Sequence, residues 1–151
     1  LKILIIGEGS QRSKIENFIK EENLYQNIFL LGFKAETEKY FEISDLVIVP
    51  SIWEGFGIVA CEGMIKGKIV LAAKVGGLTE IIQDGVNGFL YETDTLKTKL
   101  EYIFQNYDKL RFIGENAKDL VKEKFDVQKN SKLYYFEYIK RLHSIGLAKL
   151  N

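Results

Sequence analysis

An apolar run, Leu46–Val49, followed by a glycine-rich loop and a helix-forming stretch, constrains the fold of this chain more than any other feature. Four consecutive apolar residues without alternation are typical of a strand that is buried on both faces of a parallel sheet. Pro50 ends this strand, and Gly55 and Gly57 predict a tight loop before a helix that begins near Ile58. Such a loop presents free backbone N–H groups and the positive end of a helix dipole to an anion.

Two carboxylates accompany this predicted anion site. Glu54 lies in the loop, and Glu62 lies one turn inside the helix, on the same face as Ile58. Because helical side chains tilt toward the N-terminus of their helix, we expect Glu62 to point back toward the loop. An ionised carboxylate only accepts hydrogen bonds, so it suits the hydroxyls of a ribose or hexose attached to a phosphate. The pattern therefore predicts a nucleotide-sugar site.

Five segments of the chain resemble, in the same order, the motifs of one enzyme family. Glu54 and Glu62, with seven residues between them and Gly-Phe-Gly after the first, resemble the signature of family 4 retaining glycosyltransferases, which have the GT-B fold. The other four segments are Leu4–Gly9, Phe29–Gly32, Val75–Ile82 and Asp84–Leu90. The resemblance covers roughly residues 1–125 and implies the C-terminal, donor-binding domain of such an enzyme.

Strands that alternate with helices predict an α/β fold, a Rossmann-like parallel sheet covered by helices on both faces and followed by C-terminal helices. The predicted strands are Lys2–Ile6, Ile28–Leu31, Leu46–Val49, Ile69–Ala72 and Gly88–Tyr91. The predicted helices before the last strand are Gln11–Glu22, Glu36–Ile43, Ile58–Lys66 and a short one that carries Glu80, Ile81 and Ile82.

One strand of the family's domain is absent from this chain. The family has the strand order 3-2-1-4-5-6, and the resemblance implies that its first, central strand is missing here. A gap would then separate the strand Leu1–Ile6 from Leu46–Val49, and apolar sheet edges do not stay exposed. We expect one of three outcomes: the sheet closes across the gap, an upstream segment fills it, or two chains form a dimer through the open edges.

The composition is that of a single globular domain. The chain has 151 residues, 46% of them hydrophobic, and a formal net charge of zero, which favours one domain, residues 1–151, with a sizeable core. No basic excess exists to displace counterions, so we expect no nucleic-acid binding. The chain begins with Leu1 in an apolar run, so we expect a fragment of a longer two-domain enzyme. The resemblance implies an N-terminal acceptor domain as its partner, and a diphosphate-binding Arg and Lys upstream.

The expected location is the cytoplasm. One cysteine excludes an internal disulfide, and the sequence has neither a signal peptide nor an apolar run of 18 residues. A peripheral position at the inner face of the membrane is a weaker alternative, with docking through lysines 118, 122, 124, 129 and 132.

The resemblance implies a role for each residue of the predicted site. Glu62 would hold the ribose hydroxyls, and Glu54 is the candidate catalytic residue. The backbone amides that would meet the phosphate belong to Gly57, Ile58 and Val59. The residues that would meet the donor sugar are Glu54, Gly55 and Phe56. The chemical task is to stabilise charge on a departing diphosphate, and the resemblance implies no cofactor, metal or protein nucleophile. The donor is expected to be linked to UDP or GDP; the sequence gives neither the sugar nor the acceptor.

Residues near the ends of the first two strands would complete the site. Gly7 and Gly9 either form a plain turn or line the diphosphate cleft. A dinucleotide site is disfavoured, because Arg12 stands where a third glycine would be required. Phe33 is either a packing residue or a stacking platform. The residues expected beside the nucleotide base are Gly32, Phe33 and Lys34.

Several further residues carry expectations about structure. Thr79 is expected to cap the helix that follows it, and Cys61 to be a small core residue and not a nucleophile. Gly63 stands where the family usually has Ala, at a cost of about 1 kcal/mol of helix propensity. The last predicted helix, Val127–Ile145, has aromatic residues on nearly every face. It is expected to pack on its own domain, to meet the N-terminal domain, or to dock on a membrane; His143 in this helix is expected to be solvated.

Two other functions remain open. The first is a non-catalytic GT-B-like module for assembly or regulation. The intact site residues argue against it: Glu54, Gly55, Gly57 and Glu62. The second is another GT-B enzyme, an epimerase or a phosphorylase, for which we identify neither acid–base residues nor a cofactor lysine. We expect the isolated chain to bind donor weakly and to transfer no sugar. By analogy alone, the setting would be polysaccharide biosynthesis at the cell envelope or capsule.

Overall fold

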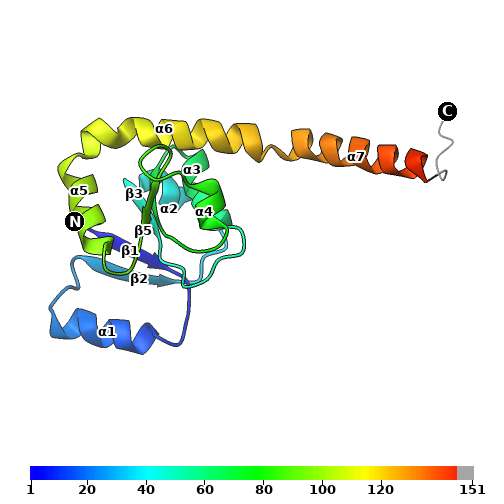
Figure 1. Cartoon of the computed structure of the whole chain (residues 1–151). Helices are drawn as coiled ribbons and strands as arrows, with labels where there is room; N and C mark the ends of the chain where they lie inside the picture. Colours follow the sequence, from blue (N-terminus) through cyan, green and yellow to red (C-terminus); the bar gives the residue numbers. More distant parts are fainter. Residues whose placement is uncertain (146–151) are drawn as a thin grey trace. The chain divides into compact units, whose positions relative to one another are not determined.

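The computed structural model describes residues 1–145 (Figure 1). The chain divides into two compact units, Leu1–Tyr40 and Phe41–Asn151, the second of which is described as far as residue 145. Each unit contains one parallel sheet.

The first unit is a β–α–β arrangement. Its elements are β1 (Ile3–Ile6), α1 (Arg12–Glu21) and β2 (Ile28–Gly32). Strands β1 and β2 pair in parallel, with Ile3 opposite Ile28. Arg12, the first residue of α1, contacts Glu16 through Nε at 2.8 Å and Glu8 through Nη1 at 3.0 Å. The hydrogen bond that Arg12 donates to Glu16 and the negative charge of Glu8 raise the pKa of Arg12, so this guanidinium is engaged at the start of its own helix.

The second unit carries the longer sheet, with the strand order β3–β4–β5. The short helix α2 (Glu38–Ile43) spans the boundary between the units. The elements that follow it are β3 (Leu46–Val49), α3 (Ile58–Ile65), β4 (Ile69–Ala73), α4 (Leu78–Ile81), β5 (Phe89–Tyr91), α5 (Leu96–Gln105), α6 (Tyr107–Lys124) and α7 (Val127–Ser144). All of these strands pair in parallel, as the uninterrupted apolar runs predict.

Helices cover both faces of this sheet. Every residue of β4 is buried, and successive side chains of a strand point to opposite faces. Val70 and Ala72 join a cluster with residues of α3, α4 and α6. Ile69 and Leu71 join a second cluster with residues of β5, α5 and α6. The α/β fold with helices on both faces is therefore confirmed, and β4 is its core.

The predicted single sheet is two sheets in the structure. β1 pairs with β2, β3 pairs with β4, and among the described residues no pairing joins β1 to β3. The prediction that the sheet closes across the gap is therefore wrong. Apolar side chains of β1 and β3 stay partly exposed, such as Leu4 at 38% and Ile48 at 40%. Filling by an upstream segment or by a second chain stays a prediction.

The last helix, α7, does not pack on its own domain. It contains no buried residue, and Tyr134, Phe136 and Tyr138 are all more than 60% exposed. The prediction of a buried helix is wrong because its apolar residues surround the helix, so no single stripe can be covered by one neighbour. His143 is exposed, as expected. Within residues 1–145, no helix is both long and apolar enough to cross a bilayer.

Thr79 does not cap helix α4. The helix begins one residue earlier, at Leu78, with Gly77 in the capping position and no side-chain cap. The Thr79 hydroxyl instead donates to the carbonyl of Gly76 at 2.8 Å. A threonine inside the first turn reaches back to a preceding carbonyl in this way, so its oxygen is directed away from the free amides.

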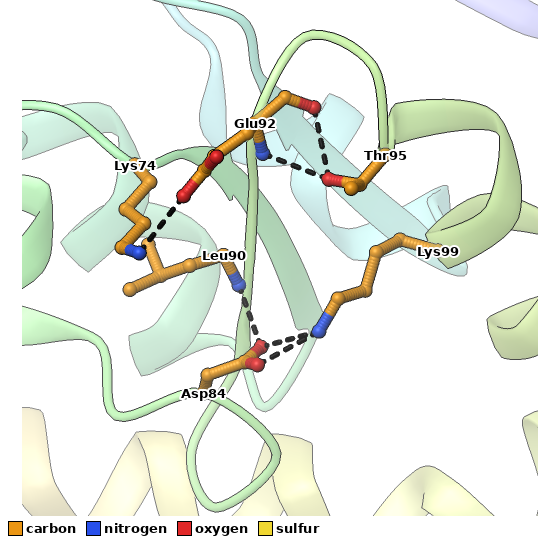
Figure 2. Close-up of polar contacts among 6 residues, drawn as sticks. All are labelled: Lys74, Asp84, Leu90, Glu92, Thr95 and Lys99. Carbon is orange, nitrogen blue, oxygen red and sulfur yellow. Dashed lines mark hydrogen bonds and ion pairs between the residues drawn. The ribbon is translucent and has the colours of Figure 1, made fainter.

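Side-chain contacts fix the segment around β5. Asp84 accepts hydrogen bonds from the backbone N–H of Leu90 at 2.9 Å and from Lys99 Nζ at 2.7 Å (Figure 2). Lys74, which follows β4, donates to Glu92, which follows β5, at 2.9 Å. The Asp84 contacts tie α5 and β5 to one turn, and the Lys74–Glu92 pair links the segments that follow β4 and β5.

Candidate functional site

Helix α3 begins at a glycine that no side chain caps. Gly57 has a left-handed backbone with φ of 102° and makes no side-chain cap. A Cβ at this position would lie 2.8 Å from Cδ2 of the buried Leu78. Glycine is therefore required for both its conformation and its size. Since the first amides of a helix have no intrahelical acceptor, the amino end of α3 presents its N–H groups for a ligand.

A pair of glycines after β4 holds the loop that precedes α3. The backbone N–H of Gly77 donates to the carbonyl of Glu54 at 2.9 Å. A Cβ on Gly76 would lie 2.1 Å from that same oxygen, and a Cβ on Gly77 would lie 2.5 Å from the carbonyl oxygen of Gly55. The two backbones approach so closely that any side chain would separate them. The sequence shows these glycines as a turn, but their contact with the loop was not predicted; adjacent glycines after a buried strand are the signal for it.

The two glutamates of the predicted site differ in their surroundings. Glu54 is half-buried, and the hydroxyl of Ser51 lies 3.3 Å from its Oε2, in donating position. Glu62 is exposed on α3. Ile58 and Val59, in the first turn of the same helix, are 65% and 48% exposed. One loop and one helix therefore bring together all the site residues predicted in this unit, and all of them except Glu54 and Gly57 are exposed. Those residues are Glu54, Gly55, Phe56, Gly57, Ile58, Val59 and Glu62.

Phe56 has a partner that the sequence did not reveal. Its ring meets that of Phe125 edge to face, with 5.2 Å between the ring centroids and 87° between the ring planes. Phe125 immediately follows α6, and Phe56 is 47% exposed. The loop is thus fixed on one side by the glycine pair and on another by an aromatic contact, while part of the Phe56 ring stays accessible.

Cys61 lies inside α3 and packs against the core. Burial raises the pKa of its thiol, and the neighbouring charge of Glu62 raises it further. A raised pKa leaves little thiolate at neutral pH, and thiolate is the reactive form. The environment therefore agrees with the expected role of Cys61 as a core residue.

In the first unit, Gly7 and Gly9 lie in the turn between β1 and α1, and Gly32 ends β2. Gly7 has φ of 130°, and its N–H donates to the carbonyl of Gly32 at 2.9 Å. Gly32 has φ of 69°, and a Cβ there would lie 2.6 Å from Oε1 of Glu8. A Cβ on Gly9 would meet nothing within 4 Å. The structure thus gives Gly7 and Gly32 a role in the backbone, whereas Gly9 faces open space.

Phe33 is 75% exposed, so the alternative that it is a packing residue is wrong. Lys34, which follows it, is half-buried. Gly7, Gly9, Gly32, Phe33 and Lys34 belong to the first unit, and the residues between Glu54 and Glu62 belong to the second. The structure brings the residues of each group together within their own unit. A single donor site made by both groups stays a prediction.

A hollow of about 330 Å³ lies away from the predicted loop, at the amino end of β4, with Lys68, Tyr107 and Arg111 in its wall. The predicted loop follows the carboxyl end of β3, so this hollow is not the predicted site. Within the part of the chain that the structure describes, no three His, Cys, Asp or Glu side chains are grouped in a way that could hold a metal ion.

Comparison with known proteins identifies the family. The sequence model described as Glycosyl transferases group 1 matches residues 1–120. The chain belongs to this family. An uncharacterised glycosyltransferase of Methanocaldococcus jannaschii is 42% identical over 124 residues, which are 79% of this chain and 35% of that relative. The chain therefore spans about a third of the length of this curated member of the family.

Solved glycosyltransferase structures share the fold. HepE of Anabaena, crystallised in complex with UDP-glucose, aligns with a TM-score of 0.80 and 30% identity over 91% of this chain and 40% of HepE. The C-terminal domain of LpcC, a group 1 family protein of Francisella tularensis, aligns with a TM-score of 0.73 and 32% identity over 83% of this chain and 70% of that domain. The GT-B glycosyltransferase fold is thereby established for this group 1 family chain.

Proposed function

We propose that this chain is the donor-binding half of a retaining glycosyltransferase that transfers a sugar from a nucleotide-diphosphate sugar to a glycan, lipid or small-molecule acceptor. The observation that carries the proposal is the uncapped amino end of α3 beside two carboxylates. Gly57 leaves the first amides free, Glu54 lies in the preceding loop, and Glu62 lies one turn along the helix. Phosphate, sugar and ribose each find a group of matching chemistry within this loop and helix.

The phosphate would bind at the amides of Gly57, Ile58 and Val59. A helix amino end carries a partial positive charge, worth up to about 2 kcal/mol for an anion in a favourable, partly buried geometry. Because the loop is fixed to Gly77, these donors are already in place before the ligand arrives. Donors placed in advance stabilise a departing diphosphate without the cost of reorganisation. This is the catalytic contribution that we assign to the chain.

The carboxylates would bind the hydroxyls. We assign Glu62 to the ribose because it is exposed on the second turn of α3, next to the phosphate amides. Glu54 would meet the donor sugar together with Gly55 and Phe56, and the Ser51 hydroxyl near Oε2 steadies its carboxylate. The complex of HepE with UDP-glucose supports a UDP-linked donor, with GDP as the alternative. Retention of configuration rests on the resemblance to family 4.

The chain would act together with a further domain. It spans 35% of the curated relative described above, and the LpcC structure is named as a C-terminal domain. By the resemblance, an N-terminal domain would supply the acceptor site, and an Arg and a Lys upstream of this segment would strengthen diphosphate binding. We therefore expect the isolated chain to bind donor weakly and to transfer no sugar. The cytoplasm is the compartment in which we place this reaction.

Ligand-observed NMR tests this function directly. The chain is mixed in turn with UDP, GDP, ADP and their common sugar conjugates, and saturation transfer to each ligand is measured. We expect one nucleotide class to bind and Glu62→Ala to abolish the signal. The matched control is Glu21→Ala, which removes another helical, exposed glutamate from α1 in the other unit. Binding that is insensitive to Glu62→Ala, or no binding even with the upstream segment restored, would favour the non-catalytic module instead.

A further inference from the structure

Phe125 lies at the joint between α6 and α7. The next residue, Asp126, caps α7, since its carboxylate accepts the N–H of Lys129 at 2.7 Å. The side-chain amide of Asn130, in α7, donates to the carbonyl of Lys124, the last residue of α6, at 2.9 Å. Groups that helix ends leave without a backbone partner are thus paired across the joint. The Phe125 side chain therefore leaves the backbone at a place that both helices define.

The Phe125 side chain connects the core to the loop before α3. It is half-buried and packs against the cluster that contains Met64. Its ring also meets the Phe56 ring edge to face, with 5.2 Å between the centroids. The backbone of Phe56 is held separately, since a Cβ on Gly77 would lie 2.6 Å from its Cα. What Phe125 adds is a preferred direction for a ring that is 47% exposed.

We propose that Phe125 is a positioning residue for the donor sugar, which acts by holding Phe56 in the orientation that meets this sugar. The inference rests on the proposed function, which assigns Phe56 to the sugar and the start of α3 to the phosphate. A side chain that becomes ordered only when the ligand binds weakens the affinity. Because Phe125 directs the Phe56 ring in advance, its loss should weaken recognition of the sugar and leave recognition of the nucleotide unchanged.

The test compares two ligands that differ by the sugar, UDP-glucose and UDP. Saturation-transfer NMR titrations of the 151-residue chain give both affinities and hence their ratio. UDP-N-acetylglucosamine is a second donor, and GDP with GDP-mannose replaces the set if the parent chain binds GDP. We expect Phe125→Leu to lower the ratio of donor affinity to nucleotide affinity about two- to tenfold, with the affinity for the nucleotide itself unchanged. Phe125→Tyr, which keeps the ring, should retain the parent ratio.

Tyr102→Leu is the matched control. Tyr102, in α5, meets Phe89, in β5, edge to face at 6.1 Å between the ring centroids, and it is 48% exposed. The change removes an aromatic pair of the same kind from the same unit, but not from the loop before α3. It should lower the melting temperature and leave the affinity ratio unchanged. Thermal melts show whether each variant is folded, and Phe125→Met replaces Phe125→Leu if that variant is not.

The outcomes separate this inference from the proposed function. An unchanged ratio in Phe125→Leu, including equal losses for UDP and UDP-glucose, would overturn the positioning role, while binding of UDP by the parent chain would keep the donor site. An equal fall of the ratio in Tyr102→Leu would also overturn it, because any loss of packing would then have the same effect. If the parent chain binds neither UDP nor GDP, even with the upstream segment restored, the donor site and the positioning role are both rejected.

Discussion

The backbone N–H of Gly77 donates to the carbonyl of Glu54 over 2.9 Å, and this bond joins the turn after β4 to the loop after β3. The contact depends on the absence of side chains at Gly76 and Gly77. Because the carboxyl ends of neighbouring parallel strands lie at the same edge of a sheet, two distant segments of the sequence meet there. This junction fixes the Glu54 backbone in the loop that leads into α3.

Replacing Gly76 tests the junction. In Gly76→Ala, the new Cβ would lie 2.1 Å from the Glu54 carbonyl oxygen, at a residue with φ of 42°. Crowding and an unfavourable backbone conformation together should lower the free energy of unfolding by about 3 kcal/mol. Urea unfolding of the variant and the parent chain measures the difference.

Gly85→Ala is the matched control for that experiment. Gly85 also has a positive φ, 75°, but a Cβ there would meet nothing within 4 Å. Only the backbone contribution remains, so the loss should be about 1 kcal/mol. Equal losses for the two variants would show that the close approach to Glu54 contributes nothing to stability.

A second prediction concerns Gly63, where the family usually has Ala. A Cβ on Gly63 would lie 3.1 Å from Cγ2 of the buried Val47. We expect Gly63→Ala to destabilise the parent chain by about 1 kcal/mol, because the crowding of Val47 outweighs the gain in helix propensity. In a Val47→Ala background, the same change should stabilise by about 0.5–1 kcal/mol. A double-mutant cycle by chemical denaturation measures this reversal, and two changes of the same sign would contradict it.

The helix and strand pattern could be predicted because it depends on local periodicity. Each predicted strand lies within about two residues of an observed one, and Ile58, as predicted, begins α3. The gap in the sheet could not be resolved in the same way, since pairing of β1 with β3 depends on a partner for each edge and not on the residues within either strand.

The residues of the site could be predicted from the sequence, but the contacts that hold its loop in place could not. Glu54, Gly55, Gly57 and Glu62 predict an anion site with hydroxyl acceptors from their residue types and spacing alone. The contacts of Gly77 with Glu54 and of Phe125 with Phe56 join residues far apart in the chain, so no local pattern indicates them. Thr79 is predicted to cap α4 because threonine favours that position. The prediction is wrong because the Gly76–Gly77 turn places the first helical residue at Leu78, so Thr79 lies inside the first turn.

Cys61 provides a chemical test of the environment of α3. Burial and the charge of Glu62 raise the pKa of its thiol, so the thiolate fraction is smaller than that of a free cysteine at the same pH. Alkylation by iodoacetamide should be slow and its pH profile displaced to higher pH. Glu62→Gln removes the second cause and should move the profile to lower pH, whereas Glu21→Gln on α1 should not. Mass spectrometry follows the reaction at this single cysteine, and an unchanged profile in Glu62→Gln would contradict the account.

The aromatic contact of the loop should be measurable as a coupling energy. Phe56 and Phe125 meet edge to face at 5.2 Å, a geometry worth about 0.5–1.5 kcal/mol beyond simple burial. A double-mutant cycle with Phe56→Leu and Phe125→Leu, read by thermal unfolding, should give a coupling in this range. Tyr135 and Phe136 on α7 are the control pair; they are more than 60% exposed and should couple by less. Equal couplings would argue that Phe125 does not brace the loop.

The most direct test of the central claim is a comparison of UDP with uridine by two-dimensional amide NMR of the chain. If phosphate binds at the amino end of α3, UDP should shift the amide signals of Gly57, Ile58 and Val59, and uridine, which lacks the phosphates, should leave them in place. Shifts of these amides by both ligands alike, or UDP shifts confined to other residues, would contradict the placement of the diphosphate on this helix.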